Sequence, residues 1–556
     1  MRPYYDKPYE IIDDYEIGRF ITPYGINLDL GPQGFTWTYD VTDYAGLLRG
    51  AVDFSAGNQQ ELIDVKFLFI TGQPPREIIK LDKLWGGLNF WYYRDLASNA
   101  ALSLTKIPVT PGASQFKVKT LLSGHGHNSN TGEYPHCCEW KDNDHYLYAN
   151  GALVRDWKIF QYNECALNPV FPQGGTWNGA REGWCPGDMV KYRDYEITEF
   201  VNSDTISIDY DITPVPPDNE GMGWGNYMVG MQLLQYGPDT FETDAEVYEV
   251  VSPGNSRYYS RLNPVCYDPE VVIRNNGSSD LTSLKFEYSV SGGKPENWYW
   301  SGLVLPHETT SVFLPVPGNS FWMGDSLHKF RVTVSLPNEL VDQYPENDTY
   351  VSRFNMPDFY NEPFVLTLKT NKQAYRYTLK IRDNMGQEVL SLENLENNTI
   401  YNDTIDFADG CYTLELIDQE NMGLSYWAYP EQGSGYLRIG SLEGVQLKSF
   451  NPDFGRSVLY AFNLGESYYI NNPDKEAFSI YPNPFRDVIR IYSPSISGRS
   501  SLKVYNSAGL CVLSREISVH PGSPVEADLS GFPDGMYLVT LQGGSEYVRK
   551  KVIKQR

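Results

Sequence analysis

Short runs of alternating apolar and polar residues, rich in β-branched and aromatic side chains, recur along the whole chain. SLKFEYSV at 283–290 and KFRVTVSL at 329–336 are typical. Alternation with a period of two residues is the pattern of a strand that buries one face. Glycine and proline, 48 and 36 residues respectively, separate these runs as turn residues do. The sequence therefore predicts an all-β fold.

A chain of 556 residues exceeds what one hydrophobic core fills, so several domains are expected. The proline-rich QPPRE at 73–77 marks the first boundary. Residues 1–73 carry only about four or five strand patterns, too few to close a sandwich around a core of their own. The expected domains are 1–75, 80–240, 245–357, 363–465 and 476–556, and the third and fourth have the strand spacing of immunoglobulin-like sandwiches.

Charge and hydropathy exclude several classes of partner. Lysine and arginine total 45 against 70 aspartates and glutamates, a formal net charge of −25, which disfavours nucleic acid. No apolar run reaches the roughly 18 residues that span a bilayer, so no transmembrane segment is expected. Met1 is followed by RPYYDKPYE and not by the basic and apolar leader of a secreted protein.

Seven cysteines are too few for a disulfide scaffold, but they suit a secreted chain with one or two bridges and at least one free thiol. Cys165 and Cys185 lie in glycine- and proline-rich loops and form the expected bridge. The adjacent Cys137 and Cys138 are poorly placed to bridge each other. The pairing of five cysteines stays open: Cys137, Cys138, Cys266, Cys411 and Cys511.

Residues 123–140, SGHGHNSNTGEYPHCCEW, concentrate groups that carry chemistry. On a strand His125 and His127 share one face, so both are candidate metal ligands. A metal site needs a third ligand, and the candidates are His136, His145, Glu139 or a cysteine. Hydrogen-bonding or purely structural histidines are the simpler alternative.

Two further residues suit acid–base chemistry. Glu139 precedes Trp140, and a carboxylate pressed against an indole loses water, which raises its pKa towards neutrality. Arg181 in WNGAREGWCPGD lies between two tryptophans, where an arginine clamps a carbonyl or polarises a water. A surface glutamate and a stacked structural arginine are the alternatives.

Taken together, these segments resemble the peptide-N-glycosidase F family of N-glycan amidases. The motifs that carry the resemblance are SGHGH at 123–127, CCEW at 137–140 and REGWCPG at 181–187, in the family's order. YEIGRFITPYG at 15–25, DVTDYAGLLRG at 40–50 and VKFLFITG at 65–72 resemble the family's first domain. The resemblance covers roughly residues 1–235 and implies two jelly-roll sandwiches, of which the first, 1–75, is incomplete.

The resemblance also implies residue roles. Glu139 takes the place of an active-site glutamate, and Arg181 that of the arginine that holds water and carbonyl oxygen. The substrate-binding residues are His125, His127, Trp140, Trp184 and Arg2, and Cys165–Cys185 matches a family disulfide. The implied reaction hydrolyses the side-chain amide of a glycosylated asparagine, with N-glycosylated proteins or glycopeptides as substrates and no cofactor or metal.

The chain departs from the family pattern at two places. The family's principal catalytic aspartate, in a Trp-Asp-Arg motif, would fall at or just before Met1, with Arg2 as the motif's arginine. Together with the missing leader, this predicts that the coding sequence begins upstream of Met1; a truncated, inactive relative is the alternative. A supporting glutamate is replaced by Gly57 or Asn58, with Asp53 and Glu61 as candidate substitutes.

The last eighty or so residues resemble a C-terminal sorting domain of the type IX secretion system of Bacteroidetes-type bacteria. The motifs are YPNPF at 481–485, VYNSAG at 504–509, GMYLV at 535–539 and the basic KKVIK at 550–554. The resemblance implies export through both membranes by the type IX machinery and a secreted or cell-surface location.

The expected architecture is therefore two jelly rolls, two immunoglobulin-like sandwiches and a small sorting sandwich, in a monomer. The expected activity is that of a secreted peptide-N-glycosidase. One alternative is an inactive glycan- or protein-binding surface module, favoured by the missing aspartate. A second is a copper-dependent monooxygenase, which rests on His125 and His127 and on the analogy of paired jelly rolls.

Overall fold

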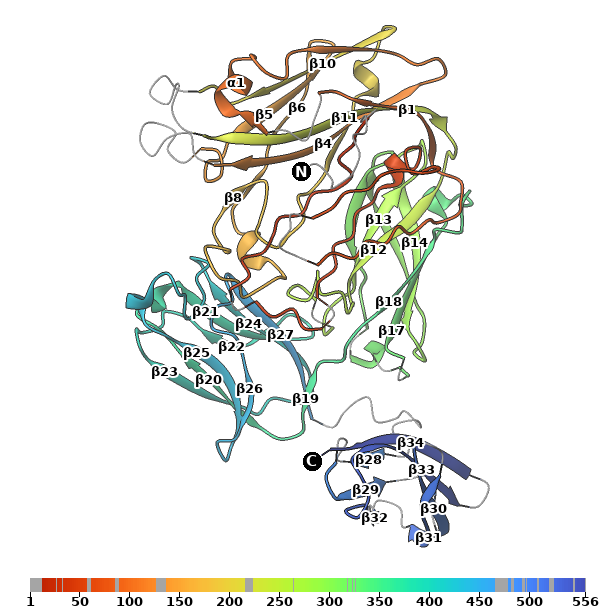
Figure 1. Ribbon diagram of the computed structural model, residues 1–556, viewed down its shortest axis with the longest axis vertical. Helices are drawn as coiled ribbons and strands as arrows, with labels where there is room; N and C mark the ends of the chain where they lie inside the picture. Colours follow the sequence, from red (N-terminus) through yellow and green to blue (C-terminus); the bar gives the residue numbers. More distant parts are fainter. Residues whose placement is uncertain are drawn as a thin grey trace, which may run out of the picture. The chain divides into compact units, whose positions relative to one another are not determined.

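The computed structural model describes most of the chain. The described residues are 13–26, 28–32, 34–57, 62–85, 90–126, 137–215, 224–263, 265–317, 319–322, 324–325, 327–465, 479–481, 485–492, 496, 498–507, 510–519, 525–543 and 546–555. They form two compact units: Met1–Tyr288, Glu296–Val316 and Phe330–Gly465 make up the first, and Ser289–Pro295, Pro317–Lys329 and Glu466–Arg556 the second. Strands dominate both units (Figure 1), which confirms the all-β prediction.

The candidate site lies in a two-sheet sandwich. One sheet has the order β1 (Arg76–Lys83), β11 (Asn226–Asp239), β4 (Gln115–His125) and β9 (Arg193–Glu196), and β2 (Phe90–Tyr92) also pairs with β11. The second has the order β3 (Thr105–Pro108), β10 (Thr205–Ile212), β5 (Asp144–Ala149) and β6 (Ala152–Lys158). The short helix α1 (Tyr93–Ala97) and a ribbon of β7 (Phe160–Gln161) and β8 (Arg181–Glu182) complete it.

The alternation of apolar and polar residues in the sequence matches the alternation of buried and half-buried residues in this core. On β10, Ile206, Ile208 and Tyr210 are buried while the residues between them are half-buried. They share a core with Val118 and Leu122 of β4 on the facing sheet. Burying one face of each sheet against the other removes apolar area from water, the main favourable contribution to folding. The long pair β4 and β11 runs antiparallel from His125↔Asn226 to Gln115↔Tyr236.

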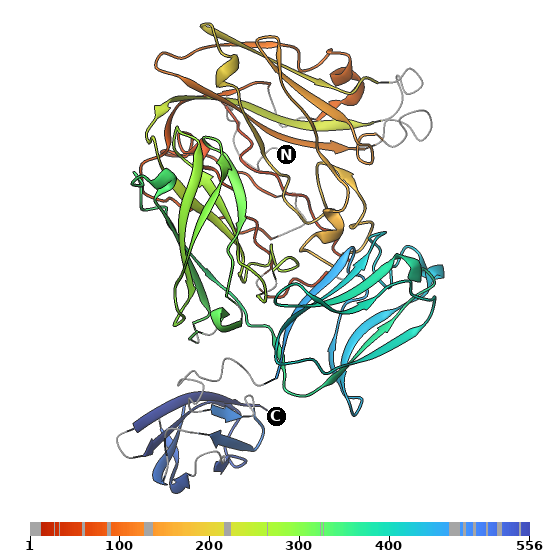
Figure 2. The ribbon, with the colours of Figure 1, turned by 180° about the vertical axis from the view of Figure 1, so that it is seen from behind.

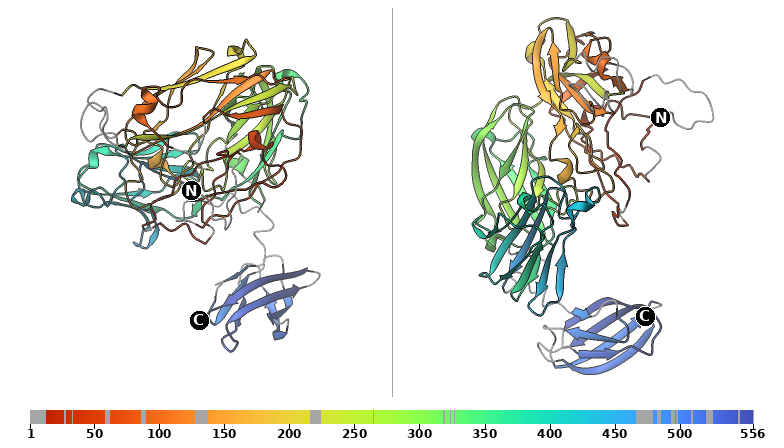
Figure 3. Two further views of the ribbon diagram at one scale, coloured as in Figure 1. Left: turned by 45° about the horizontal axis from the view of Figure 1, so that its top comes forward. Right: turned by 90° about the vertical axis from the view of Figure 1, so that its left-hand side faces the viewer.

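Segment 13–75 differs from the prediction. In the described part of 13–75 no residue lies in a named strand; the only element is the 3-10 helix η1 (Thr42–Tyr44), and Phe20 forms an isolated bridge with Met189. The strands predicted for this segment do not form in its described residues (Figure 3). The assignment of 1–75 as a domain stays a prediction. A strand needs a hydrogen-bonded partner, and without one Leu68 and Ile70 stay 82% and 93% exposed.

Side chains, not strand pairing, attach this segment to the sheet of β4 and β11. Asp43 accepts hydrogen bonds from Lys117 and from the Tyr236 hydroxyl, and Lys119 lies 3.1 Å from the same carboxylate. Burial raises the pKa of Asp43, but the two lysines outweigh it and hold that pKa well below its usual range. The adjacent Tyr44 is fully buried and donates its hydroxyl to Gln232.

Two accessory sandwiches follow. The first pairs β12 (Ala245–Ser252), β13 (Glu270–Asn275) and β16 (Thr309–Phe313) in one sheet and β15 (Glu296–Val304), β14 (Leu281–Val290), β17 (Lys329–Ser335) and β18 (Thr349–Arg353) in the other. The second accessory sandwich also has two sheets. One has the order β19 (Asp358–Tyr360), β27 (Ser457–Leu464), β24 (Gly410–Asp418), β21 (Tyr377–Asp383) and β22 (Glu388–Leu392). The other has the order β23 (Ile400–Ile405), β20 (Phe364–Lys369), β25 (Tyr436–Ser441) and β26 (Gln446–Ser449). Figure 2 shows these strands from behind.

The C-terminal strands form a smaller sandwich with its own core. One sheet has the order β28 (Ser479–Tyr481), β29 (Val488–Tyr492), β32 (Val525–Asp528). The other has the order β31 (Cys511–Val519), β30 (Gly498–Asn506), β33 (Gly535–Gly543), β34 (Glu546–Lys554). Ile489, Leu502, Val539 and Val552 from both sheets share a fully buried core. In the described part of the chain, no helix has the length and apolar character needed to cross a bilayer.

Candidate active site

Backbone hydrogen bonds fix Glu139 between the end of β4 and strand β8. The amides of Cys138 and Glu139 both donate to the carbonyl of Gly126, at 3.0 and 3.1 Å, and the Glu139 carbonyl accepts from the amide of Glu182 at 3.0 Å. Gly124 allows this close approach, because a Cβ at that position would lie 2.4 Å from the Cys138 carbonyl oxygen. The SGHGH and CCEW motifs thus meet because glycine leaves room for the turn.

Arg181 lies behind Glu139 and makes no contact with solvent. Its Nη1 donates to the Gly179 carbonyl at 2.8 Å, and its Nη2 donates to Thr176 at 3.0 Å and to the Tyr24 hydroxyl at 3.3 Å. Nε lies 3.4 Å from Oε1 of Glu139. The guanidinium is fully buried, whereas the Glu139 side chain keeps 18% of its surface exposed. Of this pair, Glu139 is therefore the group that a substrate reaches.

Two tryptophans confine the guanidinium. Its central carbon lies 4.3 Å from the Trp140 ring centroid and 4.9 Å from that of Trp184, distances at which cation–π attraction operates. Trp184 is buried and donates its indole N–H to the Gly124 carbonyl at 2.7 Å, while Trp140 is half-buried. Both rings hold Arg181 in place, and Trp140 exposes more surface for a ligand.

His125 belongs to a hydrogen-bonded chain that begins in the N-terminal segment. Glu16 accepts two hydrogen bonds from Arg19, at 2.7 and 2.6 Å, and Arg19 donates to Ser123 at 2.8 Å. The Ser123 hydroxyl in turn lies 2.8 Å from Nε2 of His125, whose ring stacks on Trp184 at 5.2 Å. Burial, with a smaller contribution from Arg19, lowers the pKa of His125 to about 4. At neutral pH this histidine is uncharged.

A second, fully buried polar network lies beside the site. Oε1 of Glu182 accepts from the Tyr227 hydroxyl at 3.0 Å and lies 3.0 Å from Nε2 of His145, whose Nδ1 meets the Tyr210 hydroxyl at 2.7 Å. Asn143 donates to Tyr227 at 2.6 Å. Burial raises the pKa of Glu182 well above its usual value and lowers that of His145 to about 3. Both shifts favour the uncharged forms of the pair, a protonated carboxyl and a neutral imidazole.

Several predicted site residues fall outside the part that the structure describes, namely Arg2, His127 and His136, and the candidate substitutes Asn58 and Glu61. Asp53 and Gly57 are exposed on segment 13–75. Among the described residues, no three of His, Cys, Asp and Glu are grouped as metal ligands. The described His125 and His145 are engaged with Ser123 and Glu182 respectively.

The structure shows which cysteines are paired and which are free. Cys165 and Cys185 form a disulfide with a Cα–Cα distance of 5.1 Å, which confirms the expected bridge. Cys266 and Cys411, whose pairing could not be read from the sequence, form a second. Cys137 and Cys138 are buried free thiols, and Cys511 is an exposed one. The expectation of one or two bridges with at least one free thiol is confirmed.

Sequence reasoning missed the residues that support the site. Arg19 and Tyr24 stand in YEIGRFITPYG, and Glu182 stands between the two motif positions Arg181 and Gly183. The sequence held one signal for a functional role of Glu182, namely that it is a charged residue inside a glycine- and tryptophan-rich motif. Its partner His145 lies 37 positions earlier in the chain, so only the fold brings them together.

Comparison with known families agrees with the motifs around this site. Residues 92–234 match the family described as "Peptide-N-glycosidase F, C terminal". This segment is therefore similar to the C-terminal domain of the peptide-N-glycosidase F family. It holds Glu139, Arg181 and both site tryptophans, and the match associates it with a family of glycan-amidase hydrolases. Residues 479–555 match the "Secretion system C-terminal sorting domain", which indicates export by type IX secretion.

Individual relatives cover only parts of the chain. The peptide-N(4)-(N-acetyl-beta-D-glucosaminyl)asparagine amidase F of Elizabethkingia miricola is 29% identical over 211 residues, which is 35% of this chain and 57% of that protein. This chain thus spans little more than half of that relative. A solved structure of recombinant peptide:N-glycanase F has 23% identity, covering 24% of this chain and 43% of its own, with a TM-score of 0.22. A second solved structure, of the peptide-N(4)-(N-acetyl-beta-D-glucosaminyl) asparagine amidase at 2.2 Å resolution, has 21% sequence identity and a TM-score of 0.28. The match covers 41% of this chain and 75% of that one.

Proposed function

We propose that this protein is a secreted peptide-N-glycosidase that hydrolyses the side-chain amide between asparagine and an N-linked glycan. The observation that carries the proposal is the placement of Glu139, a partly exposed carboxylate whose backbone makes two hydrogen bonds, to Gly126 and Glu182, and which is backed by buried Arg181. The amidase relative contributes the substrate class, since its name specifies N-acetylglucosaminyl asparagine. The match over 92–234 includes both residues.

In the proposed reaction, water adds to the amide carbon and the C–N bond breaks. Glu139 takes a proton from the attacking water and passes it to the leaving nitrogen, so that aspartate and a glycosylamine are released. Arg181 is a positioning residue, because its buried donors already hold Gly179, Thr176 and Tyr24. This role differs from the direct contact with the carbonyl oxygen that the sequence resemblance implied.

The test is an assay on a denatured N-glycoprotein and on a fluorescent N-glycopeptide. In water enriched in heavy oxygen, an amidase places one heavy oxygen in the resulting aspartate, whereas an enzyme that cuts within the glycan leaves asparagine unlabelled. The 556-residue chain is assayed beside its Glu139→Gln variant.

Glu139→Gln keeps the shape of the side chain and removes its charge, so we expect cleavage to fall roughly 100-fold or more. Glu199→Gln is the matched control, because Glu199 is an exposed glutamate at η3 (Thr198–Phe200). Full activity of Glu139→Gln, or no labelled aspartate from the wild-type chain, contradicts the proposal. Binding of glycans without any cleavage would favour the surface-module alternative.

A further inference from the structure

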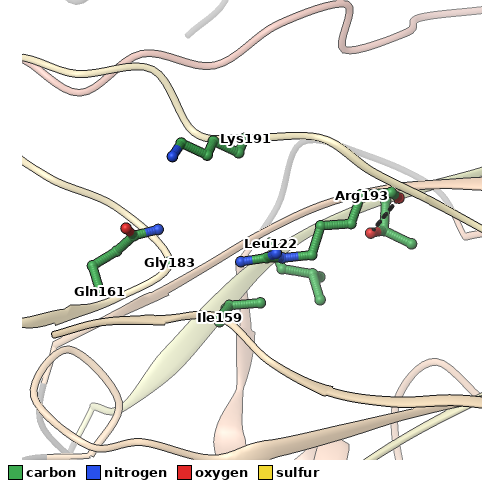
Figure 4. Close-up of a pocket in the computed structure, with 7 residues that line it drawn as sticks. Leu122, Ile159, Gln161, Gly183, Lys191 and Arg193 are labelled. Atoms are coloured by element: carbon green, nitrogen blue, oxygen red, sulfur yellow. Dashed lines mark hydrogen bonds between the residues drawn. The ribbon is translucent and has the colours of Figure 1, made fainter. Parts of the chain in front are cut away.

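The loop between β7 and β8 carries two of the acceptors that hold Arg181. Thr176 and Gly179 accept hydrogen bonds from the guanidinium at 3.0 and 2.8 Å. Gln161 of β7 and Gly183, directly after β8, flank this loop and are labelled in Figure 4. The loop backbone is irregular apart from the 3-10 helix η2 (Cys165–Leu167). Contacts from outside the ribbon must therefore fix the loop.

The second accessory sandwich, whose strands run from β19 to β27, supplies such contacts. The carbonyl of Gly175 accepts two hydrogen bonds from it, one from the Tyr426 hydroxyl at 2.9 Å and one from the Trp427 indole N–H at 2.7 Å. The Asn178 side chain donates to the Asn421 carbonyl at 2.6 Å. The loop and this sandwich belong to the same compact unit. A domain far along the chain thus holds the loop by its backbone and by a side chain.

Apolar packing joins the same two parts. Trp177 is fully buried and stacks on Phe171, which packs against the core of the second accessory sandwich. Gly455 allows the close approach, because a Cβ there would lie 2.8 Å from the Trp177 ring and 2.4 Å from the Ala166 carbonyl oxygen. Buried apolar area therefore adds to the hydrogen bonds that hold the loop against the sandwich.

The residues that the sandwich holds are neighbours of the acceptors of Arg181. Gly175 immediately precedes Thr176, and Asn178 immediately precedes Gly179. One peptide unit thus separates each contact with the sandwich from a group that accepts a hydrogen bond from the guanidinium. A shift of the sandwich contacts would move both acceptors.

Two further observations link the sandwich to Arg181. Gly175 packs against the Tyr24 ring, since a Cβ on it would lie 2.8 Å from that ring, and the Tyr24 hydroxyl accepts from Arg181 at 3.3 Å. Burial raises the pKa of Tyr426, and the charge of Arg181 opposes that rise. The tyrosine of the sandwich is thus within electrostatic range of the arginine.

We propose that the second accessory sandwich is a working part of the amidase site, in which Tyr426 and Trp427 position Arg181 through the loop. Both side chains donate to one carbonyl and so fix the peptide that precedes Thr176. Arg181, held in turn by the loop, keeps the Glu139 carboxylate in the orientation that the reaction needs. Tyr426 and Trp427 are positioning residues, because they act through Arg181 and not on the substrate. This inference rests on the proposed function.

The first test removes the two hydrogen bonds to Gly175 and keeps an aromatic ring at each position. Tyr426→Phe loses the hydroxyl, and Trp427→Phe loses the indole N–H. Trp427 is 60% exposed, so the double variant should melt near the wild-type temperature. In glycopeptide hydrolysis we expect its kcat to fall roughly 10-fold, with KM changed by less than about twofold.

Tyr401→Phe is the matched control for this variant. The Tyr401 hydroxyl accepts from the Glu396 amide at 2.7 Å, within the same sandwich. Its loss removes a hydrogen bond of the sandwich without touching the loop contacts. The kcat of Tyr401→Phe should therefore equal that of the wild type.

A double-mutant cycle separates positioning from a general loss of structure. In a Glu139→Gln background, the Tyr426→Phe and Trp427→Phe pair should lower kcat by less than about twofold, because the carboxylate that Arg181 orients is already gone. Two independent defects would multiply instead. A full loss of roughly 10-fold in that background therefore overturns the positioning role.

Hydrogen exchange measures the loop without any cleavage. Peptides within 162–182 should exchange at least about threefold faster in the double variant, while peptides of β10 exchange as in the wild type. Unchanged exchange of the loop overturns the proposal, as does a normal kcat in the double variant of an active wild-type chain. If the wild type itself releases no glycan, the proposed function fails, and the exchange rates still decide whether the sandwich holds the loop.

Discussion

Nε of the fully buried Arg181 lies 3.4 Å from Oε1 of the partly exposed Glu139. The arginine is held in this position by Gly179, Thr176 and Tyr24, which accept hydrogen bonds from its two terminal nitrogens. Chemistry at the surface carboxylate thus depends on a cation that solvent does not touch. Buried ion pairs of this kind are costly to break, because the remaining charge loses its partner without gaining water.

Replacing Arg181 with lysine should therefore damage both activity and stability. Lysine keeps the charge but loses the planar fork that serves Gly179 and Thr176. We expect the free energy of unfolding to fall by about 2–4 kcal/mol and kcat/KM to fall at least about 10-fold, mainly through kcat. Denaturant unfolding and glycopeptide kinetics measure the two effects. Arg155→Lys, on the exposed face of β6, should change neither, and an Arg181→Lys protein of normal kcat would refute the positioning role.

Glu182→Gln tests the protonated carboxyl beside the site. Burial raises the pKa of Glu182, so above the unfolded value the native state holds a proton that the unfolded state has released. Stability is then lost as the pH rises, by about 1.4 kcal/mol per pH unit. Glutamine imitates the neutral form, so the stability of Glu182→Gln relative to the wild type should increase as the pH rises above the unfolded pKa of glutamate, about 4.3. Urea unfolding at several pH values gives this difference; parallel pH profiles would show that Glu182 is ionised in the native state.

His145 should produce the opposite slope at acid pH. Its native pKa is lowered to about 3 by burial, so between about pH 6.5 and that value only the unfolded state takes up a proton. The stability contributed by the neutral imidazole is lost as the pH falls through this window. His145→Gln should lower stability at all pH values but flatten the profile below about pH 6. An equally steep acid loss in the variant would assign it to other groups.

Removing the Cys165–Cys185 bridge should destabilise the loop that carries Arg181. The disulfide closes a loop with a sequence separation of 20, and chain-entropy arguments assign about 3 kcal/mol to a bridge of this size. We expect the double Cys165→Ala, Cys185→Ala variant to melt earlier and to lose activity with it. Cys511→Ala, which removes an exposed free thiol, is the control and should melt as the wild type does. An unchanged melting temperature in the double variant would contradict the expectation.

The sequence by itself determined the class of fold and the identity of the modules. Alternating runs such as TISIDYDI predict strands because the two-residue period is local, and β10 buries Ile206, Ile208 and Tyr210 as that period requires. The motifs CCEW and REGWCPG could also be recognised in the sequence, because a motif consists of neighbouring residues only. The bridge between Cys165 and Cys185 followed from similar local reasoning.

The tertiary structure decided what depends on partners distant in the chain. VKFLFITG has the composition of a strand, yet Leu68 and Ile70 are not paired in a sheet and are exposed, because strand formation needs a neighbour that composition cannot specify. The contact between Glu182 and His145 and the bridge between Cys266 and Cys411 likewise arise only when strands far apart in sequence pack together. Burial, which shifts pKa values and removes Arg181 from solvent behind Glu139, is a property of the fold and not of any local segment.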